Sequence, residues 1–127
     1  MIDPVEESLI RAYVEAYNRF DIEGMLATLA DGVHFEHHAG GALAVATDGK
    51  AEFEKLARVG AAMFASRRQT LVSLEEQEGR VAATLDFHGE IAEDIPEGPR
   101  AGTVIEMRGT SAFGFDDGRI ALVIDRA

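Results

Sequence analysis

The first half of the chain carries three runs of apolar residues at helical spacing, separated by short polar breaks. The first run covers residues 4–19, with Asp3 as an N-capping residue and Pro4 at the first helical position. The second covers residues 22–30 and the third covers residues 50–66. The pattern therefore predicts three helices, each with one apolar face.

The rest of the chain alternates between apolar and polar residues, as half-buried strands do. Strands are predicted at residues 33–38, 69–77, 80–91, 103–115 and 119–125. The glycine-rich segment 39–47 is expected to form a loop with one short edge strand. Helices followed by a run of antiparallel strands predict one α+β domain over residues 1–127, with its helices packed on one face of a sheet.

The last predicted strand, residues 119–125, is apolar on both faces. This is typical of a strand at the centre of a sheet or at a subunit interface. Ala121 and Val123 are expected on the face turned away from the helices, where they need a cover. We therefore predict a homodimer formed through that face.

The net charge of −11 excludes several classes of partner. An acidic surface repels the phosphates of nucleic acids and of anionic membranes. The chain has no apolar run long enough to span a bilayer, and its first residues lack the pattern of a secretory signal. It also contains no cysteine, so we expect a cytoplasmic protein without disulfides or thiolate metal sites.

The strand at residues 33–38 contains three of the four histidines. Side chains alternate along a strand, so His37 shares the inward face with Val33 and Phe35. An imidazole can accept or deliver a proton near neutral pH, which makes His37 the best candidate for an acid–base group. The alternative is a buried histidine that is hydrogen-bonded to the backbone.

The other face of this strand carries His34, Glu36 and His38, a set that resembles a two-histidine, one-carboxylate metal site. The outer pair is about 13 Å apart on a straight strand, whereas ligands lie about 2.0–2.2 Å from their ion. We therefore expect no metal at these residues. No phosphate-binding glycine loop is present either, so no cofactor is expected.

Four segments resemble the nuclear transport factor 2-like superfamily, and within it the SnoaL-like polyketide cyclase and ketosteroid isomerase branch. They are FDIEGMLATLADGVHFEH, the glycine-rich loop, DGKAEFEKL and FDDGRIALV. The resemblance covers nearly the whole chain. It implies a cone-shaped, cystatin-like fold in which three helices pack on a curved, mostly antiparallel sheet around an apolar cavity, in proteins that are usually dimers.

The resemblance also implies roles for individual residues. The family's oxyanion-stabilising tyrosine corresponds to Tyr13, and its aspartate base corresponds to His37. The family's protonated aspartic acid corresponds to Arg108, or to Met107 or Gly109 if the strand contains a bulge. A steroid isomerase proper is therefore not expected. Five residues are expected to contact the substrate: Tyr17, Phe35, Phe53, Met107 and Arg108.

The direction of Arg108 is open at this point. Alternation along its strand turns it outward with Glu106, whereas the family resemblance turns it into the cavity, where a guanidinium would bind a substrate carboxylate or enolate. Asp86 and His88 are expected on the polar outer face. Arg67 and Arg68 are expected to be solvated charges at the end of the third helix.

The expected function is a cofactor-free enzyme that isomerises, cyclises or dehydrates an apolar carbonyl compound by proton transfer. His37 would be the base, and Tyr13 would donate a hydrogen bond to the substrate oxygen. The alternative is a non-catalytic module of the same fold that binds small ligands or dimerises.

Overall fold

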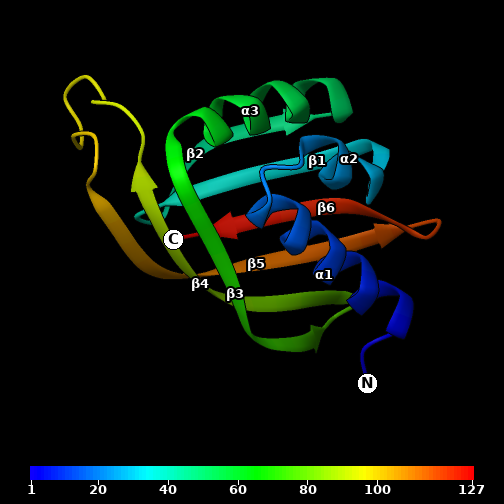
Figure 1. Ribbon diagram of the computed structural model, residues 1–127. Coiled ribbons are helices and arrows are strands. Elements are labelled where there is room, and N and C mark those ends of the chain that lie inside the picture. The colour runs from blue at the N-terminus through cyan, green and yellow to red at the C-terminus, as the bar shows by residue number, and fades with distance from the viewer.

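The computed structural model describes residues 1–127. Three helices lie on one side of a six-stranded sheet (Figure 1). The elements are α1 (Pro4–Asn18), α2 (Ile22–Ala27), β1 (Leu29–Ala39), β2 (Ala42–Asp48), α3 (Lys50–Ala62), β3 (Phe64–Gln77), β4 (Arg80–Ile91), β5 (Val104–Asp116) and β6 (Arg119–Arg126). The predicted α+β fold, with a curved and mostly antiparallel sheet, is confirmed. None of the helices is long and apolar enough to cross a membrane.

The strand order is β2-β1-β6-β5-β4-β3, and only β1 and β6 run parallel. β6 is therefore central, which explains why it is apolar on both faces. The expectation that Val123 faces outward is wrong: Val123 is fully buried opposite Phe35, on the helix side. Leu122 and Ile124 occupy the outer face instead, aligned with His34 and Glu36. Residues 120–124 of β6 are all apolar, so this part of the strand contains no alternation from which its faces could be told apart.

α2 and α3 end earlier than predicted because the residues that follow them form hydrogen bonds with the sheet. The amide of Ile120 donates to Thr28 O at 2.9 Å, and Leu29 pairs with Ile120, so β1 begins before the expected glycine stop. α3 ends at Ala62 and β3 begins at Phe64. Arg67 and Arg68 consequently lie on a strand and not at a helix end, which corrects the prediction for both.

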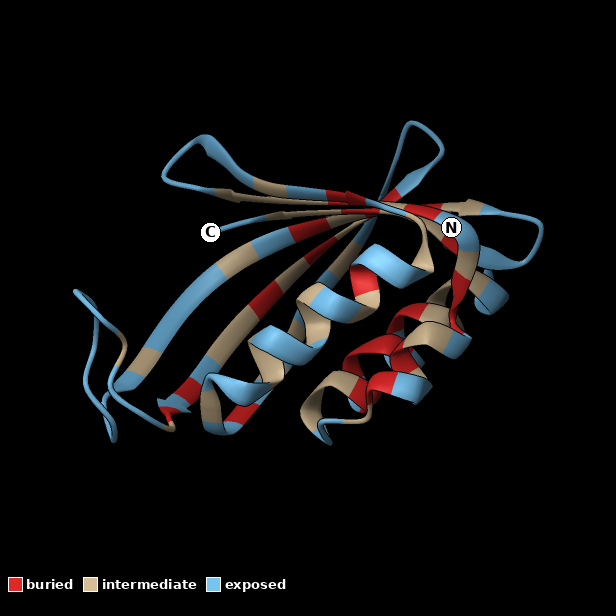
Figure 2. Ribbon diagram, turned by 90° about the horizontal axis from the view of Figure 1, so that it is seen from above, coloured by how far each residue is buried: buried red, intermediate tan, exposed pale blue.

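The core lies between the sheet and the first two helices, where buried positions of both layers face each other (Figure 2). Asp3 caps α1 as predicted, since its carboxylate accepts from Val5 N at 2.7 Å. α3 behaves differently. Phe53 is its only buried residue, although Leu56, Ala57 and Gly60 also face inward. Leu56 and Ala57 are partly buried against the core, and their side of the helix also borders a cavity.

Ile120→Ala tests the packing around the central strand. Ile120 is fully buried, and removing its side chain leaves a hole against Leu29, so we expect the free energy of unfolding to fall by about 2–5 kcal/mol. Urea denaturation measures the loss. Val72→Ala on β3 is the control, because Val72 is exposed and its truncation should change stability by no more than about 0.5 kcal/mol. Equal effects of the two substitutions would contradict this description of the core.

Candidate active site

A cavity of about 500 Å³ lies between the sheet, α1 and α3. Of the 26 residues that line it, 17 are hydrophobic, so it suits a ligand that is mostly apolar. Val59 on α3, Met63 directly after α3 and Met107 on β5 line the cavity and are also exposed. These three side chains form an apolar rim through which such a ligand can enter.

One row of paired residues crosses the sheet beneath the cavity and carries its polar groups. His37 on β1 pairs with Asp125 on β6, and Asp125 pairs with Ser111 on β5. Val45 extends the row to β2, on the other side of His37. Ladder partners point to the same face of a sheet, and all four line the cavity. The register therefore brings an imidazole, a carboxyl and a hydroxyl side by side.

Asp125 is the carboxyl inside this cavity. Removal from water raises its pKa, because the charged form is disfavoured there. Two neighbours oppose this: the hydroxyl of Ser111 donates to Oδ1 at 2.5 Å, and the charge of His37 favours the carboxylate. The net direction is upward, so Asp125 keeps its proton to a higher pH than an exposed aspartate does.

Two tyrosines of α1 border the same cavity, one helical turn apart. Tyr13 packs edge-on against Phe113 at 5.9 Å between ring centroids. Burial raises its pKa well above the ordinary value, and the negative charge of Asp125 adds to the effect. Burial also raises the pKa of Tyr17, but the charge of Arg67 opposes it. Both phenols therefore remain protonated hydrogen-bond donors.

Arg67 enters the cavity from β3 and is only 7% exposed. Its Nε donates to Tyr17 O at 3.0 Å, and its guanidinium lies over the Tyr17 ring at 3.7 Å from the centroid. Asn18 fixes this stretch of β3, since its side-chain amide exchanges two hydrogen bonds with the backbone of Gln69. α1 thus holds the strand that carries the arginine.

The structure places most of the predicted site residues in this one cavity. His37, Tyr13, Tyr17, Phe35, Phe53 and Met107 all line it. Phe35 and Phe53 also pack edge-to-face against each other, with 5.4 Å between ring centroids.

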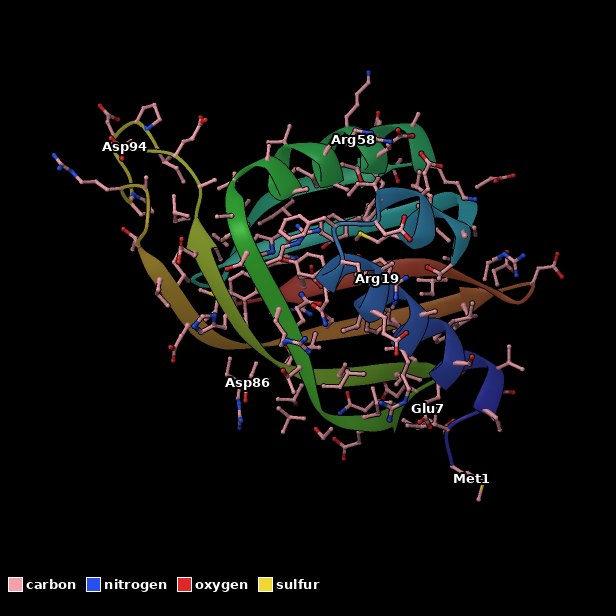
Figure 3. All side chains as sticks on the ribbon, viewed as in Figure 1. Met1, Glu7, Arg19, Arg58, Asp86 and Asp94 are labelled. Carbon is pink, nitrogen blue, oxygen red and sulfur yellow. The ribbon has the colours of Figure 1, made fainter.

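Arg108 is the exception. It lies on the outer face and forms a two-pronged ion pair with Asp86 at 2.7 and 3.0 Å. Asp86 is its direct ladder partner, and Figure 3 shows that residue away from the helices. This corrects the expectation that Arg108 contacts the substrate, and strand alternation was the better guide. Met107 and Gly109 face inward in its place, but a side chain at 109 would meet Arg126 O at 2.7 Å. No acid can replace that glycine without a backbone shift.

The outward histidines form a hydrogen-bonded chain. The carboxylate of Glu36 bridges His34 and His38 at 2.7 and 2.8 Å, and Asp48 contacts the other ring nitrogen of His34 at 2.7 Å. Hydrogen bonds from His34 to the carboxylates of Asp48 and Glu36 raise the pKa of His34, and hydrogen bonds donated by His38 and His34 lower the pKa of Glu36. These residues satisfy one another on the face away from the cavity.

Sequence reasoning missed Asp125 and Arg67. Asp125 shares its face with Val123, so placing Val123 inward would have found it. Arg67 was assigned to a helix end because the pattern of α3 runs into β3 without a glycine or proline to separate them. The inward alternation of Arg67, Gln69 and Leu71 was the available signal.

Solved structures with this fold include several from bacteria. A proposed polyketide cyclase from Xanthomonas campestris pv. campestris is 28% identical, with a TM-score of 0.76 over 97% of this chain and 90% of that one. A nuclear transport factor 2-like protein of unknown function from Burkholderia pseudomallei K96243 is 21% identical, with a TM-score of 0.79 over 97% and 90%. TerC, co-crystallised with polyporic acid, is 19% identical, with a TM-score of 0.75 over 97% and 90%.

The comparison with curated proteins found no match. The family model of the SnoaL-like domain matches residues 10–123, which include His37, Ser111 and most of the cavity lining. This chain therefore belongs to the SnoaL-like domain family.

Proposed function

We propose that this protein is a cofactor-free enzyme that transfers protons on an apolar carbonyl compound. The observation that carries the proposal is the pairing of His37 with Asp125 at the wall of an apolar cavity that Tyr13 also lines. A base, an acid that holds its proton and a phenol donor are the groups that enolisation requires.

His37 is the proposed base. It takes a proton from the carbon next to the substrate carbonyl, and the electron pair of that C–H bond moves toward the carbonyl oxygen. The oxygen then carries the negative charge of an enolate. Isomerisation, aldol-type cyclisation and dehydration can each proceed through such an enolate. They differ in the bond that forms or breaks afterwards.

Tyr13 and Asp125 are the proposed donors to the enolate oxygen. Because Ser111 donates to Oδ1, the proton of neutral Asp125 belongs on Oδ2, from which it can be given to the substrate. Protonation of His37 then makes Asp125 a stronger acid, since the positive charge of the imidazolium lowers the pKa of the carboxyl. Proton uptake by the base thus favours proton donation to the oxygen.

Asp125 is proposed to take the place of the protonated aspartic acid of ketosteroid isomerase, which this chain lacks on β5. Ketosteroid isomerase stabilises its oxyanion with a phenol and with a carboxylic acid that an apolar site keeps neutral. The residue of this chain that corresponds to that acid is Arg108, which faces outward and pairs with Asp86. However, the two groups that donate hydrogen bonds to the oxyanion can come from any strands that line the cavity. Here the proposed acid comes from β6, and the neighbouring strand β1 supplies the base.

The substrate class is supported by the apolar lining and by the size of the cavity, which suits a compound of roughly two or three rings. TerC, which shares the fold, was crystallised with the small molecule polyporic acid. The homodimer remains a prediction. Leu122 and Ile124, and not Val123, are the apolar side chains of β6 that such an interface would cover.

Deuterium exchange tests the proposed chemistry before the substrate is known. The protein is incubated in D₂O with a panel of apolar cyclic ketones such as α-tetralone, and NMR follows loss of the proton next to the carbonyl. We expect His37→Gln to slow catalysed exchange by roughly 10²–10⁴-fold, because it removes the base. Asp125→Asn should slow it by roughly 10²–10³-fold through loss of an oxyanion donor.

His88→Gln is the matched control, because His88 lies exposed on the outer face of β4, opposite Glu106. Its exchange rate should equal that of the unchanged protein. Retention of full exchange in His37→Gln would refute the assignment of the base. Ketones that bind without faster exchange would instead support the non-catalytic binding module.

A further inference from the structure

Arg67 is a buried cation without a counter-ion. It takes part in none of the ion pairs of this chain, so no carboxylate lies within ion-pair distance of its guanidinium. One hydrogen bond, from Nε to Tyr17 O, uses one of its five N–H donors. Nη2 is fully buried and has no hydrogen-bond partner. Taking such a group out of water is unfavourable unless something compensates it.

The surrounding rings account for only part of that compensation. The guanidinium lies 3.7 Å from the centroid of Tyr17 and 4.6 Å from that of Phe20, which gives cation–π attraction. Burial lowers the pKa of Arg67, and hydrogen bonding with the Tyr17 side chain opposes this because it favours the charged guanidinium. Neither interaction supplies a negative charge. A bond to a single carbonyl could equally be made by a neutral glutamine. The charge itself and the planar set of free donors are therefore unexplained by the fold.

We infer that Arg67 binds an anionic oxygen group of the ligand, and that the natural ligand is an apolar carboxylic acid. A guanidinium matches a carboxylate through two parallel hydrogen bonds, and the match is strongest where water is excluded. The inference rests on the proposed function in one respect. It assigns the carboxylate that Arg67 binds and the reacting carbonyl to one ligand in one cavity.

The two tyrosines indicate how far the carboxylate lies from the reacting carbonyl. Arg67 lies over the ring of Tyr17, and Tyr13 lines the same cavity. Tyr13 and Tyr17 are four residues apart on one face of α1, about one helical pitch of 5.4 Å. A ligand whose carboxylate is held by Arg67 thus reaches Tyr13 with a carbonyl roughly one ring away. The substrate class that fits is a cyclic or aromatic keto acid.

Matched ligands separate charge recognition from apolar binding. Calorimetry near neutral pH compares 2-naphthoate with its methyl ester, which has nearly the same shape and no charge. We expect the acid to bind roughly 10- to 100-fold more tightly, as is typical of hydrogen bonds to charged groups. Arg67→Gln should abolish this preference while leaving the affinity for the ester nearly unchanged. Binding of the ester also reports that the variant is folded.

Arg68→Gln is the control, since Arg68 is the next residue on β3 and is exposed. It should keep the full preference for the acid, and Arg67→Lys should keep part of it. The inference is overturned if the ester binds as tightly as the acid, or if Arg67→Gln retains the preference. Because binding needs no turnover, His37→Gln should also keep the preference. A negative result in the binding experiment therefore leaves the proton-transfer proposal intact. A negative result in the deuterium-exchange experiment leaves the proposed carboxylate site at Arg67 intact.

Discussion

The parallel pairing of β1 with β6 is the constraint on which the site depends. Because these strands are neighbours, His37 lies beside Asp125 and Phe35 lies beside Val123, two residues further back on each strand. His37 and Asp125 face the cavity, and Phe35 and Val123 belong to the hydrophobic core. A register shift of one residue in β1 would turn His37 and Phe35 to the outer face, away from Asp125 and Val123. The same contacts therefore determine both the stability and the chemistry of this region.

The cavity combines an apolar lining with a small number of polar groups that form two clusters. Asp125 with Ser111 and His37 occupies one part, and Arg67 against Tyr17 occupies another. The low polarity between them strengthens each electrostatic interaction and keeps the carboxyl protonated to a higher pH. α3 contributes little to the packed core because its inward face borders the space that a ligand would fill. α3 therefore gains less stability from burial of apolar side chains than it would if the cavity were filled by the core.

The helices, the six strands and the α+β class could be predicted because their signals are local: apolar periodicity, the Asp3 cap and the hairpin at Asp117-Gly118. His37 and Tyr13 were also found, since alternation and helical spacing turn them inward. Asp125 and Arg67 were missed because their orientation depends on tertiary contacts. β6 is apolar on both faces, and the boundary between α3 and β3 is set by pairing with β4. Arg108 was placed in the substrate site on the family resemblance, although alternation along its strand gave the outward direction that the structure shows.

The titration of Asp125 tests the central claim most directly, because the proposed chemistry needs a carboxyl that holds its proton. The carboxyl resonances of ¹³C-labelled aspartate are followed by NMR against pH, and Asp125→Asn identifies the signal. We predict a midpoint above the ordinary value of about 3.9, and a further rise in Ser111→Ala, which removes the hydrogen bond to the carboxylate. A folded-state pKa above the unfolded one also means that this residue's contribution to stability is lost as the pH rises through that midpoint. A midpoint at or below the ordinary value would contradict the account.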